Sequence, residues 1–129
     1  MSTIFSKIVR GEIPAHIVAE DDQFLAFLDV FPIAKGHTLV IPKKETDYIL
    51  DLEDDEFKAL WLFAKKVGKK IDLVIPCERI GIAVIGLEVP HAHIHLVPIN
   101  GIGDINFSNP KLKFSNEEMK SISAAISNA

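Results

Sequence analysis

Apolar residues recur along this chain at two different intervals, and each interval predicts a different kind of secondary structure. Beyond Asp51 they recur every three or four positions, which predicts one long helix whose apolar face contains Leu52, Phe57, Leu60, Trp61, Ala64, Val67 and Ile71. Acidic residues stand near the start of this segment and lysines near its end, an order that suits the helix dipole. Residues 2–12 and 115–126 predict two shorter helices, the second opened by a capping box of Ser115 and Glu118.

Five short apolar segments, each bounded by turn residues, predict β-strands at 16–20, 24–30, 37–42, 79–87 and 91–99. Short connections between consecutive strands favour antiparallel pairing. The predicted fold class is α+β, with an antiparallel sheet of about five strands, one long helix on a face and short terminal helices. The chain of 129 residues shows no repeat, low-complexity tract or linker, so we expect residues 1–129 to form a single domain.

Composition and charge exclude several classes of function. The net charge of −4 and the lack of a basic patch argue against binding to nucleic acid. Residues 1–14 carry charges and no apolar stretch typical of a signal peptide, and no segment approaches the roughly 20 apolar residues of a membrane span. The single cysteine, Cys77, has no partner for an internal disulfide, which suits a reducing compartment. We therefore expect a cytoplasmic protein that contacts neither nucleic acid nor membrane.

The segment "EVPHAHIHLVP", residues 88–98, places three histidines at alternate positions. Because side chains alternate between the faces of a strand, His91, His93 and His95 are expected to form a row on one face, with the small and aliphatic residues between them in the core. Each imidazole has two ring nitrogens that need partners, so three of them in register are a costly way to fill space. The spacing therefore indicates chemistry rather than packing alone.

Two kinds of chemistry suit such a row. Histidines at alternate positions can supply two zinc ligands, but three in one strand extend over about 13 Å, too far for one ion unless the strand bends. Alternatively, the central His93 attacks phosphorus as a neutral imidazole and forms a phosphohistidine that water later hydrolyses. Its neighbours then supply donors to the phosphate oxygens and a proton to the leaving group. We favour the second interpretation and expect neither a metal nor another cofactor.

The segment "HAHIHLV" matches the motif His-x-His-x-His-x-x with hydrophobic x, and the chain resembles the histidine triad (HIT) family. The segments "IFSKIVRGEIPA" and "FLAFLDVFPIAKGHTLVIPKK" are similar to parts of its purine-nucleoside phosphoramidase branch, so the resemblance covers about residues 4–98. It implies a HIT-like fold, a homodimer with a joined sheet, and a nucleotide substrate derived from a purine nucleoside monophosphate. It also implies cleavage of nucleoside phosphoramidates or dinucleoside polyphosphates through a nucleotidyl-histidine intermediate, generally without metal.

The resemblance also assigns roles to individual residues. His93 matches the nucleophile, His91 and His95 its flanking partners, and His37 a fourth histidine beside the site. Asp29 matches the acid that binds the ribose hydroxyls. The remaining substrate-binding positions that it implies are Ile4, Phe5, Ile8, Phe27, Leu28, Val30, Glu88 and Val89. Without the resemblance, a turn-capping role before Pro32 is favoured for Asp29. The apolar residues Ile4, Phe5, Ile8 and Phe27 are then expected in the core, and His37 is equally a surface residue.

The chain departs from the family pattern beside the motif. The preceding strand lacks an asparagine that the family often has there, and "GLEV" replaces Gly-Gln-Ser-Val, which places Glu88 where a hydroxyl often meets the leaving group. An ionised carboxylate repels a phosphate chain and attracts a cationic amine, so Glu88 favours phosphoramidates over polyphosphates. The segment after Asn100 does not match the phosphoramidase branch closely. A catalytically weak nucleotide-binding protein of the same fold is therefore the alternative function.

Trp61, Leu62 and Phe63 are consecutive within the long helix, so at least one large apolar side chain points away from the core. Exposed apolar surface of this kind favours a protein partner. We therefore expect a homodimer packed around this helix.

Overall fold

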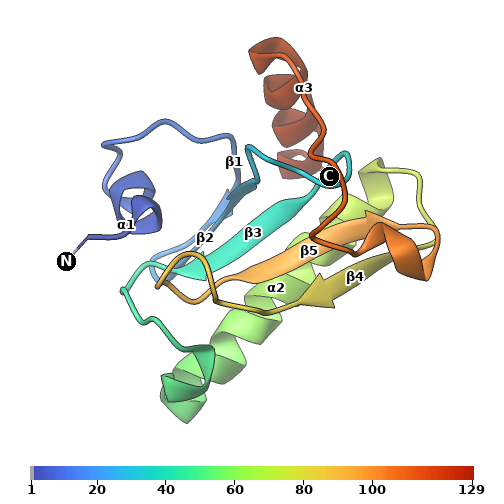
Figure 1. The fold of residues 1–129 in the computed structure, drawn as a ribbon. Coiled ribbons are helices and arrows are strands. Elements are labelled where there is room, and N and C mark those ends of the chain that lie inside the picture. Colours follow the sequence, from blue (N-terminus) through green and yellow to red (C-terminus); the bar gives the residue numbers. More distant parts are fainter. Residues whose placement is uncertain (1) are drawn as a thin grey trace.

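The structure is a computed structural model that describes residues 2–129. Its elements are α1 (Ile4–Val9), β1 (Ile17–Glu20), β2 (Phe24–Leu28), β3 (Thr38–Pro42), the 3-10 turn η1 (Ile49–Asp51), α2 (Asp54–Val74), β4 (Arg79–Ala83), β5 (Ile94–Ile99), the 3-10 turn η2 (Ile102–Asp104) and α3 (Asn116–Ser127). The strands form one sheet in the order β1-β2-β3-β5-β4, and every neighbouring pair is antiparallel (Figure 1). The predicted α+β fold with a five-stranded antiparallel sheet is thus confirmed.

The long helix α2 crosses one face of the sheet, and α3 packs beside it (Figure 1). Its buried side chains recur at helical spacing, as predicted, and enter the larger core: Leu60, Ala64, Val67 and Ile71. Three acidic residues occupy its first turn, where they interact favourably with the positive end of the helix dipole. The helix begins at Asp54 rather than at Asp51, because residues 49–51 form the separate turn η1 and Leu52 is extended. None of the described helices is long and apolar enough to cross a bilayer.

Strands β2 and β3 are buried on both faces, so their alternate side chains enter two different cores. Leu28 of β2 packs into the larger core under α2, whereas its neighbour Phe27 faces the other side of the sheet. The smaller core on that side is closed by α1 and contains Phe5, Leu25, Phe27, Leu39 and Ile41. The sheet therefore has an α2 face and an α1 face.

The expected strands 79–87 and 91–99 are both shorter in the structure, where β5 begins only at Ile94. The backbone before β5 has a partner outside the sheet, because the N–H of Ala92 donates to the carbonyl of Thr46 at 2.6 Å. The residues that join β4 to β5 therefore form a loop. The predicted alternation still holds, since Ala92 and Ile94 both enter the core under α2.

After β5 the chain turns at η2 and returns across the sheet to α3 (Figure 1). The N–H of Leu112 donates to the carbonyl of Pro32 at 2.8 Å, which fixes this returning segment to the turn between β2 and β3. The predicted capping box of α3 is confirmed: Ser115 and Glu118 each accept the other's backbone N–H, at 3.1 and 2.9 Å. The same segment passes over the α1 face, where the histidines lie.

Candidate active site

His93 lies one residue before β5, and a backbone contact fixes the position of its ring proton. Its Nδ1 is 2.7 Å from the carbonyl oxygen of His91. A carbonyl can only accept, so Nδ1 carries the proton and Nε2 has a free lone pair. Within the described residues Nε2 has no protein partner. The ring of Phe5 packs edge-on at 5.1 Å between centroids and supports this orientation.

His37 and His95 form a buried pair whose protons are fixed in the same way. The N–H of Ile33 donates to Nδ1 of His37 at 3.1 Å, so a neutral His37 carries its proton on Nε2. That proton is donated to Nδ1 of His95 at 3.0 Å. A neutral His95 then carries its own proton on Nε2. The centroids of the His95 and His93 rings are 4.9 Å apart, so the ring with the free lone pair and the ring with the free N–H donor are neighbours.

His91 has a different role from its two companions. Its ring is fully buried, with Nε2 2.7 Å from the carbonyl oxygen of Pro42 and Nδ1 2.9 Å from Oγ1 of Thr3. Nε2 therefore donates, Nδ1 accepts, and neither nitrogen is left to contact a phosphate. The expected row of three available imidazoles is thus reduced to two, His93 and His95. His91 instead connects α1 to the site and holds the carbonyl that orients His93.

Glu45 and Thr3 extend this network and were not identified from the sequence. Oε1 of Glu45 accepts the Oγ–H of Ser6 at 2.6 Å and the N–H of Thr3 at 3.0 Å. These two hydrogen bonds hold the pKa of the Glu45 carboxyl below its usual value, and the bond from Ser6 is the larger cause. The start of α1 is therefore tied to the loop after β3, across 39 to 42 positions of sequence. No local pattern signals a contact of that separation.

Burial keeps the paired imidazoles neutral. It lowers the pKa of His37 from 6.5 to about 4, with the charge of Lys111 as the next cause. It lowers the pKa of His95 to about 3, helped by the neighbouring His93 and His37. The pKa of His91 is also lowered, mainly by burial. At neutral pH these histidines act as hydrogen-bonding groups without charge.

Acid should therefore destabilise the fold before its carboxylates titrate. The pKa of His37 and that of His95 are depressed in the folded state, so the unfolded chain binds protons first as the pH falls below 6.5. Between pH 7 and pH 5 each of these two histidines should lower the free energy of unfolding by about 2 kcal/mol. Urea unfolding at several pH values measures this loss. A free energy of unfolding that stays constant over that window would contradict the buried, neutral pair.

Asp29 combines two of the roles considered from the sequence. Its Oδ1 accepts the N–H of Phe31 at 2.9 Å, which confirms the turn-capping role. Its other oxygen, Oδ2, lies 3.6 Å from Nε2 of His37, and the side chain retains 17% exposure. One carboxylate oxygen therefore remains at the edge of the site, where it can accept hydrogen bonds from a diol.

Asp29, His37 and His95 also offer ligand atoms that all lie within 4.8 Å of one another, as a metal site would require. The proton positions oppose that use. A metal needs the lone pair on Nε2 of His37, but the N–H of Ile33 occupies Nδ1 and thereby holds the proton on Nε2. The cluster fits a chain of hydrogen bonds better than a metal ion.

The predicted apolar wall is divided by the sheet. Phe5 and Phe27 are buried together on the α1 face, with ring centroids 5.6 Å apart, and Ile8 and Val89 pack against them. The side chains of Ile4 and Val30 are more than half exposed, so they are available to a ligand. Leu28 does not belong to this wall, because its side chain lies in the core under α2. Glu88 is exposed in the loop that leads to the motif.

One residue of the returning C-terminal segment, Phe107, contacts the histidines, and a second, Lys111, is hydrogen-bonded to it. The ring of Phe107 lies 4.6 Å from that of His95 and 6.1 Å from that of His37, measured between centroids. Nζ of Lys111 donates to the carbonyl of Phe107 at 2.7 Å. The sequence gives no signal for either residue, since the segment has no periodicity and contacts the site only through the fold.

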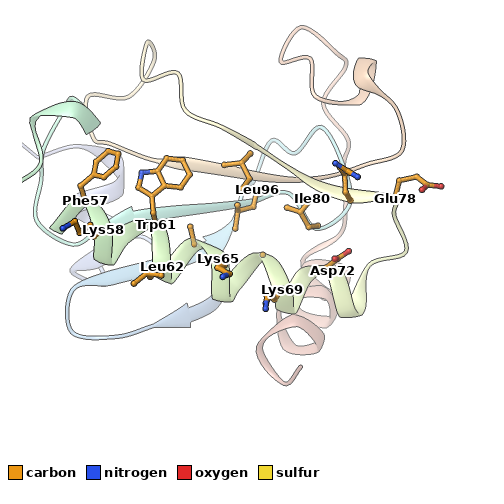
Figure 2. Close-up of a pocket in the computed structure, with 14 residues that line it drawn as sticks. Phe57, Lys58, Trp61, Leu62, Lys65, Lys69, Asp72, Glu78, Ile80 and Leu96 are labelled. Carbon is orange, nitrogen blue, oxygen red and sulfur yellow. The ribbon is translucent and has the colours of Figure 1, made fainter. Parts of the chain in front are cut away.

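Cavities among the described residues lie both away from this cluster and beside it. One, of about 960 Å³, runs between α2 and β4, with Phe57 and Trp61 at one end and Asp72 and Glu78 at the other (Figure 2). None of the four site histidines lines it. The other, of about 620 Å³, reaches His93 and is otherwise mostly apolar.

Comparisons with known proteins identify relatives of this chain by sequence and by fold. The HIT domain family model matches residues 10–101. An uncharacterized HIT-like protein of Methanocaldococcus jannaschii is 41% identical over 110 residues, which cover 79% of this chain and 83% of that protein. Adenosine 5'-monophosphoramidase hnt1 of Schizosaccharomyces pombe is 36% identical over 130 residues, covering 98% and 97% of the two chains. The crystal structure of a Hit-like protein from Bartonella henselae superimposes with a TM-score of 0.85 at 29% identity, covering 98% of this chain and 95% of that one.

Proposed function

This chain belongs to the HIT domain family, and from that premise we propose that it cleaves purine nucleoside phosphoramidates through a nucleotidyl-histidine intermediate on His93. Members of the family are nucleotide hydrolases or transferases in general, and the fission yeast relative is named as a phosphoramidase. One observation carries the proposal: the free Nε2 lone pair of His93 stands beside the free Nε2–H of His95. A nucleophile and an oxyanion donor are therefore fixed next to each other before any substrate arrives.

The first step forms the bond between Nε2 of His93 and phosphorus and breaks the phosphorus–nitrogen bond of the substrate. The imidazole becomes positively charged, and the carbonyl of His91 stabilises that charge through its contact with Nδ1–H. The Nε2–H of His95 donates to a phosphate oxygen as negative charge develops there. The amine leaves with the bonding electron pair and takes a proton from solvent. Water then attacks phosphorus and loses a proton to solvent. The bond between phosphorus and Nε2 of His93 breaks, its electron pair returns to the imidazole, and the nucleoside monophosphate is released.

The nucleoside is expected to lie on the α1 face, beside the smaller core. Phe5, Phe27 and Ile8 form an apolar support for a purine, and Ile4 and Val30 expose the surface that would cover it. The free oxygen of Asp29 would accept the ribose hydroxyls. A purine is proposed because the wall is broad, apolar and aromatic, features that suit stacking on a flat ring.

A labelled substrate tests the intermediate directly. An AMP–amine conjugate that carries radioactive phosphorus is mixed with the protein, quenched in alkali because phosphohistidine is labile in acid, and digested. Label should appear on the peptide that contains His93. Binding of AMP without turnover would instead support the alternative, a nucleotide-binding protein of the same fold.

Glu88 should set the preference for the leaving group. A carboxylate about 4 Å from a departing charge contributes about 1 kcal/mol in water, so Glu88→Ser should lower the ratio of kcat/KM for an AMP–amine conjugate to that for a dinucleoside polyphosphate by about fivefold. The two rates are measured side by side at low salt. Asp22→Ser, which removes an exposed carboxylate from the hairpin turn between β1 and β2, is the matched control. An unchanged ratio in Glu88→Ser would end this assignment.

A homodimer is also proposed, with a second copy covering the groove between α2 and β4 (Figure 2). Strand β4 is at the edge of the sheet, and the groove exposes 60% of Leu62 and 52% of Ile82. The Nε1 of Trp61, which also lines the groove, is buried without a partner among the described residues. Sedimentation should give twice the chain mass of 14.3 kDa at micromolar concentration, and Leu62→Glu should shift the protein toward the monomer. A wild-type monomer would contradict the proposal.

A cytoplasmic location is proposed on the basis of the single cysteine. Cys77 is a free thiol, and burial is the first cause that raises its pKa. A thiol of raised pKa is a weak nucleophile that persists in a reducing compartment.

A further inference from the structure

The segment between η2 and α3 is held firmly against the histidine pair. Phe107 packs its ring on His95 and His37, as described above. At one end of the segment, Nδ2 of Asn109 donates to the carbonyl of Gly103 at 2.8 Å. At the other end, Leu112 is hydrogen-bonded to the turn between β2 and β3, whose Ile33 fixes the tautomer of His37. The segment and the pair are therefore parts of one rigid arrangement.

A phosphate at His93 needs a positive charge that the histidines do not supply. The paired imidazoles are neutral, and the carboxylate of Asp29, 3.6 Å from Nε2 of His37, repels an anion. Two cations on neighbouring elements are already paired: Arg10 with Glu12, and Lys43 with Glu20 at 2.7 Å. Neither of these two cations is therefore free to bind a phosphate, whereas the returning segment carries further lysines.

Lys111 of the returning segment is placed to supply this positive charge. Its Nζ donates to the carbonyl of Phe107, the residue whose ring covers His95. An ammonium group has three N–H donors, so two remain free after this contact. The charge of Lys111 lowers the pKa of both His37 and His95, as expected for an ammonium group close to the pair.

We propose that Lys111 binds the phosphate of the substrate and that Phe107 is the positioning residue that keeps it beside His95. The inference rests on the proposed function and adds two residues to the site. Phe107 shields the pair from water, and its backbone carbonyl fixes the direction of the lysine side chain. The C-terminal segment then forms the phosphate-binding wall opposite α1.

The test compares AMP with adenosine, because the two differ by the phosphate alone. Calorimetric titration of Lys111→Met at low salt should show about tenfold weaker binding of AMP, the size expected for one charge-assisted contact to phosphate, with unchanged binding of adenosine. Lys111→Arg should retain most of the affinity. The matched control is Lys113→Met, which removes an exposed lysine two positions along the same segment and should bind AMP as the wild type does. The loss in Lys111→Met should also shrink as salt is added.

Phe107→Ala tests the positioning role. It removes the ring that holds the segment against His95 but keeps the carbonyl that Lys111 contacts, so it should weaken AMP binding by displacing Lys111. The double variant with Lys111→Met should lose less than the sum of the two single losses, since both changes act on the same contact with phosphate. Phe107→Tyr should restore the affinity. In the free protein, NMR titration should show the pKa of His95 rising in Phe107→Ala as water reaches the ring.

The outcomes separate this inference from the function on which it rests. Wild-type protein that binds AMP while Lys111→Met binds it equally well overturns the role of Lys111 alone. Equal losses of AMP affinity in Lys111→Met and Lys113→Met also overturn the role of Lys111, because they would reflect the net charge of the protein rather than a specific contact. Wild-type protein that fails to bind AMP overturns the proposed function itself.

Discussion

Replacing His93 with alanine should lower turnover of an AMP–amine conjugate by at least about 10³-fold, because covalent catalysis loses its nucleophile. No other imidazole can take over. Both nitrogens of His91 are bonded within the protein, and the free nitrogen of His95 carries a proton rather than a lone pair. The apolar wall keeps Phe5 and Phe27 in this variant, and Phe5 loses only its edge contact with the imidazole, so the affinity for AMP should change by less than about threefold.

The measurement is kcat and the AMP dissociation constant on the same preparation. His16→Ala is the matched control, since His16 is the fifth histidine, is half-buried and has no place in the site. Its turnover should equal that of the wild type. Residual turnover above a tenth in His93→Ala would mean that another group attacks phosphorus.

Replacing His95 with leucine should reduce both catalysis and stability. The substitution removes the Nε2–H donor to the phosphate, which should lower kcat by about 10²-fold. It also leaves the buried Nε2–H of His37 without its acceptor, which should cost about 2 kcal/mol of the free energy of unfolding. Steady-state kinetics and urea unfolding separate the two effects.

A second substitution distinguishes a broken hydrogen bond from a general loss of packing. In the double variant His37→Leu with His95→Leu, the donor and the acceptor of the contact between the rings are both removed, and only the N–H of Ile33 loses its acceptor. The loss of stability should therefore be smaller than the sum of the single losses. Additive losses would show that the 3.0 Å contact between the two rings contributes little.

Local pattern was sufficient for much of the fold. The helical spacing of Leu60, Ala64, Val67 and Ile71 predicted the long helix because one face must be buried for its whole length. The antiparallel sheet followed from short apolar segments with short connections. Element ends were less accurate where a distant group intervened. The N–H of Ala92, for example, bonds to Thr46 rather than to a strand, so β5 starts late.

Site residues could be predicted where their spacing in the sequence or the family resemblance marked them, and not elsewhere. The alternation around His93 gave the motif, but the partners that decide which nitrogen is free come from Ile33 and from the carbonyl of His91. Leu28 was assigned to the wrong face of the sheet, because a family correspondence names a position and not the direction of its side chain. Phe107 and Lys111 reach the histidines only once the chain has turned back over the sheet.

The bond between Thr3 and His91 has a practical consequence for anyone producing the protein. Oγ1 and the backbone N–H of Thr3 are hydrogen-bonded to His91 and Glu45. A purification tag or fusion partner joined ahead of Ser2 would therefore disturb the contacts that hold His91, whose carbonyl orients the nucleophile. The other terminus is a better attachment point, since Ala129 is exposed at the end of α3 and touches none of the histidines. Preparations tagged at opposite ends should therefore not be assumed to have equal activity.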